Sequence, residues 1–447
     1  MSEAAVAAAQ NPSAPYERVD ADRAVAKAAR RLIPFLVTGF IVAYLDRVNI
    51  GFAALTMNSE LGFTPEFFGW GAGVFFIGYC LFEAPSNYIM HRVGARIWIA
   101  RIMVSWGFVS ALTAFVWSEA SFVILRLLLG VMEAGFAPGV ILYLTYWIPA
   151  AQRARVLAGF LIAVPVSTAI GSPISGLILA SLDGVAGISG WRWLFLMEAL
   201  PSVILGAVCF FYLPDGPQSA KWLTSGEKAS LRAALESDAG QDHGDHWRAL
   251  KDARVLMLGV AYFGIVLALY GLGFWLPQII KAFGFGVIVT SLLASIPYVC
   301  AALAMWAWSR SSDRRRETVG HTALAAIVGA AGLACAAYAP TPLLSMIALS
   351  VAAVGAIAAL PTFWSFTTQT LGSGDAVVGV AVINSIGNIS GFAGPYLVGL
   401  IKGATGEFSD ALLALAFGPL ITALLLWRAR RSANNIYPAL GASVRRR

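Results

Sequence analysis

The sequence is dominated by apolar runs that are long enough to cross a membrane. A helix that spans about 30 Å of hydrocarbon needs about 20 mostly apolar residues. Six such runs lie at 34–57, 68–90, 96–117, 120–147, 155–181 and 193–213, and six more at 255–280, 287–308, 319–339, 341–367, 376–401 and 410–428. Only 12% of the 447 residues are charged, against about 25% in a soluble domain. We therefore expect an all-α polytopic membrane protein with twelve transmembrane helices, which excludes most soluble enzymes.

A polar stretch divides these runs into two sets of six. It holds much of the charge found outside the runs, and we expect a partly helical linker there. Residues 1–30 lack the basic start, apolar run and cleavage site of a signal peptide. The expected organisation is an N-terminal tail at 1–33, a six-helix bundle at 34–213, a linker at 214–254, a second six-helix bundle at 255–430 and a basic tail at 431–447.

The basic residues predict the orientation of the chain. If the N-terminus is cytoplasmic, all but five of the 31 Lys and Arg residues lie on the cytoplasmic side, as the positive-inside rule requires. The exceptions are Arg47, Arg126, Arg192, Lys281 and Lys402. The net charge of +7 is then loop charge that faces anionic lipid, and not a nucleic-acid surface. Both termini, the linker and the tails are therefore expected in the cytoplasm of a bacterial cell, with the helices in its inner membrane.

The two bundles resemble each other in sequence. His91-Arg92 follows the second run and Asp313-Arg314 follows the eighth, at an offset of 222 residues. Pro173 and Pro395 share this offset, and Pro138 and Pro361 differ by 223. Offsets so nearly equal indicate duplicated six-helix units, an architecture in which the substrate binds between the halves near the middle of the membrane.

Charged residues within the first bundle mark a candidate site. A charge in the middle of a bilayer costs about 2.5–3.5 kcal/mol or more, so each one needs a reason. Asp46 and Arg47 lie mid-way along the first run, and Arg126 and Glu133, seven residues apart, share one face of the fourth. Two ion pairs are possible, Asp46 with Arg126 and Arg47 with Glu133. They form either a protonatable anion site or static contacts between helices.

The second bundle has no matching charges. Positions 222 residues after the four charged residues hold Ala268, Leu269, Ala348 and Gly355. Aromatic and amide side chains are present instead, which suggests that this half packs the body of the substrate. We expect Glu198, near the end of the sixth run, to be structural. Beside the four charged residues, the candidates are Tyr79 and Asn384 for substrate contact, and Glu83, Asn388, Trp275 and Trp364 for gating.

Several stretches resemble the major facilitator superfamily, and within it the anion:cation symporter family of organic-anion carriers. The loop from Asn87 to Arg96 is similar to the superfamily motif, with Asn87 and His91 in place of its usual Gly and Asp. Stretches similar to the symporter family are 44–51, 81–87, 94–101, 126–135, 190–198, 213–217, 273–277, 384–388 and 394–396. The resemblance runs from about residue 30 to 405 and is greatest to bacterial tartrate, phthalate and hydroxyphenylacetate permeases, with galactonate carriers more distant.

This resemblance implies proton-coupled import of a small organic carboxylate by alternating access. In the galactonate carriers, the residues that match Asp46 and Glu133 are the proton-linked acids, and the residue that matches Arg47 contacts the sugar acid. Val164 replaces a polar amide of those carriers, which favours a less hydroxylated or an aromatic acid. The family fold implies two six-helix pseudo-repeats, in agreement with the repeat offsets.

Two alternatives remain at this level. An anion exchanger or a drug or metabolite exporter would keep the same fold and change only the coupling. A membrane-bound sensor or enzyme is disfavoured, because no nucleophile–base pair, metal-ligand cluster or GxxxxGK[ST] phosphate loop is present in the sequence. We expect no metal or cofactor, with the proton as the coupling ion, and a monomer whose partners are the carboxylate and membrane lipids.

Overall fold

The computed structural model describes residues 14–149, 152, 156, 159–238 and 251–436, and it is helical throughout these ranges apart from short turns. The expected calls on Arg153, Arg155, residues 1–13 and the Arg445–Arg447 tail lie outside the described residues. Eleven helices in the described ranges are long and apolar enough to cross a membrane. The all-helical membrane fold expected from the sequence is confirmed.

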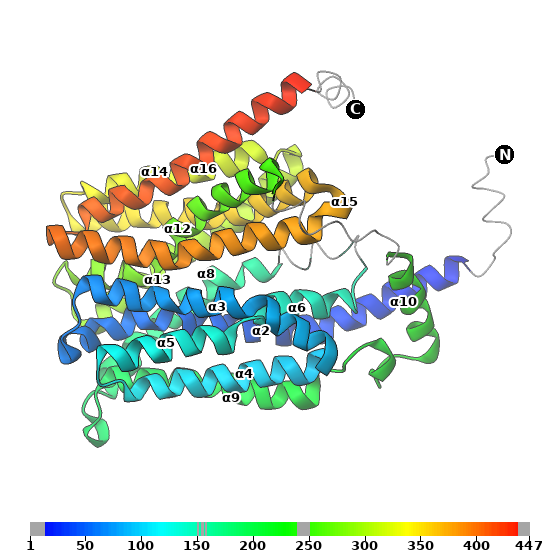
Figure 1. Cartoon of the computed structure of the whole chain (residues 1–447), viewed down its shortest axis with the longest axis horizontal. Coiled ribbons are helices and arrows are strands. Elements are labelled where there is room, and N and C mark those ends of the chain that lie inside the picture. The colour runs from blue at the N-terminus through cyan, green and yellow to red at the C-terminus, as the bar shows by residue number, and fades with distance from the viewer. Residues whose placement is uncertain (1–13, 150–151, 153–155, 157–158, 239–250, 437–447) are drawn as a thin grey trace.

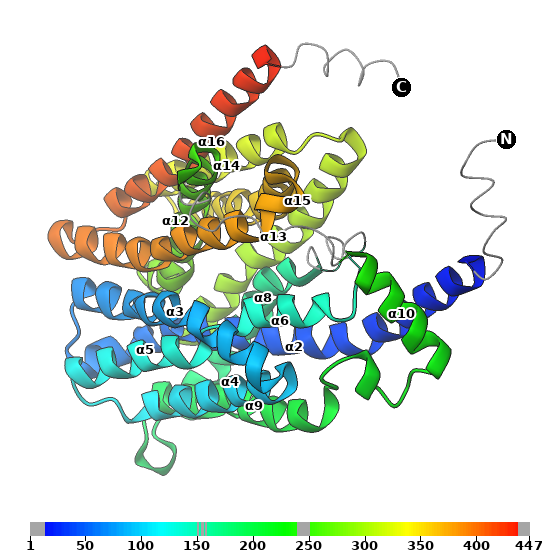
Figure 2. The same ribbon diagram turned by 45° about the vertical axis from the view of Figure 1, so that its right-hand side comes forward.

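The first half of the chain forms one group of helices, seen in the lower part of Figures 1 and 2. Its elements are α2 (Ala14–Leu61), α3 (Pro65–Val93), α4 (Ala95–Leu112), η1 (Thr113–Phe115), α5 (Glu119–Glu133), α6 (Phe136–Thr145), α8 (Ala163–Ser181), η2 (Val185–Gly187) and α9 (Gly190–Tyr212). The segment that follows α9 contains η3 (Pro217–Ser219) and α10 (Ser225–Asp238). α10 lies beside the start of α2.

The second half forms the upper group in both figures. It comprises α12 (Ala253–Lys281), α13 (Val287–Arg315), α14 (Val319–Ala337), α15 (Pro342–Thr405) and α16 (Ser409–Ile436). We call the end of the molecule that holds α10 the linker end. The hairpin end is the opposite one, which holds the turns after α2, α8, α12 and α14.

α15 accounts for the difference between twelve expected spans and eleven helices. It contains both runs expected at 341–367 and 376–401. A straight helix of its 64 residues would be about 96 Å long, three times the hydrocarbon thickness. A Cβ on Gly379 would lie 2.7 Å from Cδ1 of Leu371, a contact that eight residues of straight helix do not allow. The element therefore folds back on itself between these residues, and its two limbs run antiparallel.

Two helices extend beyond the expected boundaries. α2 begins at Ala14, inside the stretch expected to be a tail, and α16 continues to Ile436. The extension of α2 is held by α10, because Nζ of Lys27 donates a hydrogen bond of 2.5 Å to Oε1 of Glu227. The linker is thus partly helical, as predicted, and it docks on the first half.

The expected run at 120–147 is broken in its middle. α5 ends at Glu133 and α6 starts at Phe136, with Gly135 at φ +86° between them. Only glycine adopts this backbone region readily. A Cβ there would also lie 2.3 Å from Oγ of Ser86. Discontinuous helices of this kind are typical of substrate and ion sites in transporters.

The two halves meet through small residues near the hairpin end. A Cβ on Gly69 of α3 would lie 2.5 Å from the carbonyl oxygen of Pro395 on α15, and one on Gly399 would lie 2.5 Å from that of Pro65. Gly176 of α8 faces Ser291 of α13 in the same way. Small side chains allow backbones to approach closely where lipid supplies no hydrophobic drive. These contacts hold the halves together at the hairpin end.

Candidate functional site

Arg47 lies where the two halves meet, about mid-way along the spanning part of α2. Its Nη2 pairs with Oε1 of Glu133, the last residue of α5, and its Nη1 donates a hydrogen bond of 2.9 Å to the hydroxyl of Tyr270 on α12. The expected pairing of Arg47 with Glu133 is therefore observed. The guanidinium joins the two halves, because its two partners belong to different bundles.

An aromatic wall covers the other sides of this guanidinium. The rings of Phe75 and Tyr79 on α3 each lie with their centroid 5.2 Å from Cζ of Arg47, and that of Phe76 lies at 5.9 Å. These rings attract a cation through their faces and exclude water. Tyr79, an expected substrate contact, is buried directly beside Arg47.

Asp46 points away from Arg126, so the expected pairing of these two residues is wrong. Its Oδ2 accepts hydrogen bonds from Nε1 of Trp106 at 2.9 Å and from Oγ of Ser202 at 2.6 Å. Its Oδ1 accepts one from Oγ of Ser110 at 3.2 Å. Successive helical residues point about 100° apart. Asp46 therefore faces α4 and α9 while Arg47 faces α5 and α12.

Arg126 is buried between α3 and α5 without a carboxylate partner in the described part of the chain. Its Nη2 donates a hydrogen bond of 3.0 Å to the carbonyl oxygen of Ala72, and its Cζ lies 5.2 Å from the ring centroid of Phe75. Within the described residues, Nε and Nη1 of Arg126 make no hydrogen bond. Phe75 is thus contacted by both buried guanidinium groups, those of Arg47 and Arg126.

A second polar contact joins the halves one turn beyond Tyr79. Glu83 of α3 accepts hydrogen bonds from Nδ2 of Asn384 at 3.1 Å and from Nδ2 of Asn388 at 3.4 Å, both on the second limb of α15. The structure therefore brings together three of the expected residues from both bundles. They lie on the linker side of Arg47, because α3 runs towards that end.

The two expected tryptophans lie elsewhere. Nε1 of Trp275 donates a hydrogen bond of 3.0 Å to the carbonyl oxygen of Pro395, in the contact between the halves at the hairpin end. The ring of Trp364 packs on Tyr262 with centroids 4.8 Å apart, inside the second half. Trp275 stabilises the hairpin-end contact, and Trp364 stabilises the packing of α12 on α15.

Four partners of the charged residues were missed as site residues: Tyr270, Trp106, Ser110 and Ser202. Tyr270 follows Arg47 by 223 residues, within one residue of the repeat offset, and this signal could have found it. The three partners of Asp46 carry no such signal, because hydroxyl and indole groups are common in membrane helices.

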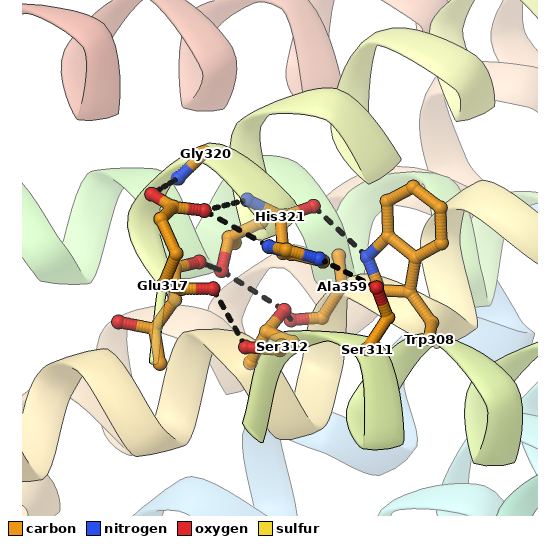
Figure 3. A network of polar contacts seen from close by, with 10 residues as sticks. Trp308, Ser311, Ser312, Glu317, Gly320, His321 and Ala359 are labelled. Carbon is orange, nitrogen blue, oxygen red and sulfur yellow. Dashed lines mark hydrogen bonds and ion pairs between the residues drawn. The ribbon is translucent and has the colours of Figure 1, made fainter. Parts of the chain in front are cut away.

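A separate polar cluster fixes the turn between α13 and α14 at the linker end (Figure 3). Oε2 of Glu317 contacts Nδ1 of His321 at 2.9 Å, and Nε2 of His321 lies 3.2 Å from Oγ of Ser311. Glu317 also accepts hydrogen bonds from the backbone N–H groups of Gly320 and His321, which caps α14. Trp308 donates to the carbonyl oxygen of His321 at 3.0 Å. The cluster belongs to the second half alone and lies apart from Arg47.

Comparison with known proteins identifies the family of this arrangement. The model of the Major Facilitator Superfamily matches residues 36–395. The chain belongs to the major facilitator superfamily. It is therefore a membrane transporter, and the expected family and fold are confirmed.

Relatives within this superfamily cover nearly the whole chain. It is 48% identical to a protein of Agrobacterium vitis described as a putative tartrate transporter, over 92% of both chains. It is 38% identical to a quinolone resistance transporter of Acinetobacter baumannii, over 90% of this chain and 94% of the other. The xylose transporter XylE of Escherichia coli, solved in a partially occluded inward-open conformation, superposes with a TM-score of 0.71 over 90% of this chain at 13% identity. That similarity shows the shared fold.

Proposed function

We propose that this major facilitator transporter imports a small organic carboxylate together with protons by alternating access. The observation that carries the proposal is the Arg47–Glu133 pair, which contacts Tyr270 of the other half. The guanidinium is the only kind of basic side chain that offers two parallel donors to a planar carboxylate. The tartrate-transporter description of a relative supports a carboxylate substrate.

The coupling follows from competition for Arg47. While Glu133 is ionised, it occupies the guanidinium and the site is neutral. When Glu133 binds a proton, the pair is broken and Arg47 is free to bind the substrate carboxylate. Release of the proton restores the pair and expels the anion. Proton and anion therefore enter the membrane together, and the buried net charge stays low throughout.

The orientation of the transporter is part of the proposal. With both termini in the cytoplasm of a bacterial inner membrane, the linker end faces the cytoplasm and the hairpin end faces outside. The glycine contacts at Gly69, Gly176 and Gly399 then close the outer side. In this state a monomer would release substrate inwards, past Glu83 and its two amide partners.

The test is uptake by purified protein in proteoliposomes. Labelled tartrate, phthalate, hydroxyphenylacetate and galactonate are offered with an inward proton gradient. Arg47→Ala and Glu133→Gln are compared with wild type, with Arg23→Ala and Glu66→Gln as matched controls at exposed positions. We expect uptake to require the gradient, to be lost in Arg47→Ala and to become gradient-independent exchange in Glu133→Gln. Gradient-driven uptake that is unchanged in both variants would contradict the site.

A second candidate function is export or exchange on the same fold, which the quinolone resistance relative favours. The same vesicles separate the possibilities. Symport is abolished by a protonophore and persists without internal anion. Exchange requires internal anion, and export appears as gradient-driven movement of a quinolone out of the compartment that the linker end faces.

A further inference from the structure

Two carboxyl groups lie buried in the first half without a cation beside them. Asp46 and Glu198 are 1% and 3% exposed, and within the described residues neither forms an ion pair. Asp46 accepts its hydrogen bonds from neutral donors, as described above. Oε1 of Glu198 accepts one of 2.7 Å from Oγ of Ser175 on α8. A carboxylate without a countercharge is costly in such surroundings, so a group of this kind binds a proton readily.

The two acids lie along one seam between α2 and α9. At the hairpin end of the seam, Nε1 of Trp191 donates a hydrogen bond of 2.7 Å to Oε2 of Glu60. Towards the middle of the membrane, Oγ of Ser202 donates to Asp46 at 2.6 Å. Glu198 lies seven residues after Trp191 and four before Ser202, so all three share one face of α9. The carboxyl of Glu198 therefore lies between Glu60 and Asp46.

An unsatisfied amide occupies the gap beside Glu198. Asn49, one turn from Asp46 on α2, is 1% exposed and interacts with the Glu198 carboxyl. Neither amide atom of Asn49 reaches a hydrogen-bond partner within the described residues, and Oε2 of Glu198 also has none. Buried polar atoms are almost always paired. These atoms line a polar space in the seam that is open to a proton or a bridging water.

We propose that Glu198 is a second proton-binding carboxyl, which passes protons between the hairpin end and Asp46. The proposal rests on proton-coupled transport and assigns its route through the first half. The proton leaves the Glu198 carboxyl through the Asn49–Ser202 space and protonates the Asp46 carboxylate. Glu198 remains ionised until it takes up a proton from water near Glu60. No other reactant is needed, and the charge moved is that of one proton.

The neighbouring elements place few other charges in the seam. α2 contributes Asp46 and Glu60, and α9 contributes Arg192, which lies 3.5 Å from Glu60 at the hairpin end. α8 contains no titratable residue, and α4 carries its charged residues at positions 96 and 101, towards the linker end. Glu133 acts on Asp46 from the other side of α2. Glu198 is therefore the titratable group that lies between the mouth and Asp46.

The test uses the full-length protein in proteoliposomes with a pH-sensitive dye inside and labelled tartrate as probe. We expect Glu198→Gln to lower gradient-driven accumulation and tartrate-induced proton entry about hundredfold, the low end of what a positioned proton-transfer group contributes. Tartrate–tartrate exchange, which needs no net proton movement, should stay near the wild-type rate. Glu66→Gln is the matched control, since it removes an exposed acid at the same end. Accumulation and pH dependence like those of wild type in Glu198→Gln would overturn the assignment.

Infrared difference spectra of the purified protein between acid and alkaline pH supply an independent readout. A protonated-carboxyl band that disappears in Glu198→Gln and shifts in Glu198→Asp supports the proposal, and a spectrum unchanged in both overturns it. This measurement decides the matter even if Glu198→Gln loses exchange activity. If wild type shows no proton-driven uptake of any of the four acids, proton coupling itself fails, and the infrared band still reports on Glu198.

Discussion

Arg47 donates a hydrogen bond from Nη1 to the hydroxyl of Tyr270 at 2.9 Å, and this contact joins the two halves of the transporter at the Glu133 pair. Tyr270 occupies the position in the second half that the internal repeat matches to Arg47 within one residue. One repeat thus supplies the cation and the other a neutral hydroxyl. A substrate carboxylate bound to Arg47 would have this hydroxyl within reach.

Tyr270→Phe tests the contact between the halves. Because a single hydrogen bond of this kind contributes about 1 kcal/mol, we expect the apparent KM for the transported acid to rise about fivefold, with the fold intact. Uptake kinetics in proteoliposomes provide the measurement. Tyr338→Phe is the control, since that side chain is 75% exposed. An equal effect of both substitutions would show that the hydroxyl of Tyr270 has no special role.

Gly69→Ala tests the closed hairpin end. A Cβ at this position would lie 2.5 Å from the backbone of Pro395, which cannot move as a side chain can. We therefore expect the variant to favour a conformation in which the hairpin ends of the two halves separate. Labelling rates of a cysteine introduced at Ser291 should rise several-fold in that background.

The control for this substitution is Gly286→Ala, where nothing lies within 4 Å and φ is −66°. Its labelling rate should equal that of the parent. Equal rates in Gly69→Ala and the parent would mean that the contact between α3 and α15 does not hold this end closed.

Gly135→Ala tests the break after Glu133. The left-handed backbone costs a non-glycine residue about 1–2 kcal/mol, and the new Cβ would also press on Ser86. We expect lower thermal stability in detergent and weaker transport, because Glu133 would be displaced from Arg47. Gly184→Ala has a similar φ of +77° with open space around it. It should show only the backbone cost and keep transport, and an identical loss in the two variants would argue against a role for the break.

The docking of α10 on α2 should depend on pH. The hydrogen bond from Lys27 and those from Thr224 lower the pKa of Glu227 below its ordinary value. The undocked linker has the ordinary pKa, so the docked form is favoured above about pH 4.3. This contribution is lost as the pH falls through the lowered pKa.

Limited proteolysis in the linker measures this docking. Cleavage should accelerate at acidic pH in wild type. Glu227→Gln should be cleaved rapidly already at neutral pH, because it lacks the ion pair. Glu236→Gln, whose side chain is 63% exposed, serves as the control. A cleavage rate in Glu227→Gln equal to that of wild type at neutral pH would contradict the assignment.

Much of the fold could be predicted because lipid leaves the chain few choices. Every backbone polar group in a bilayer must be paired within its own helix, so apolar run length alone indicates the spans. The runs at 341–367 and 376–401 were placed correctly, although they form the two limbs of one element. The break at Gly135 was not predicted, because glycines are frequent in membrane helices and only tertiary packing shows which one is strained.

The sequence by itself determined that the chain is a two-bundle membrane transporter, and it placed Arg47 and Glu133 together. Seven residues of helix and the cost of an unpaired charge were sufficient for that. The tertiary structure decided how the remaining polar groups are distributed. Asp46 faces Ser202 and the Glu198 seam, Arg126 faces a backbone carbonyl, and Tyr270 completes the site from the other half. These outcomes depend on the rotation of each helix about its axis, which is set by packing against neighbours that are distant in the sequence.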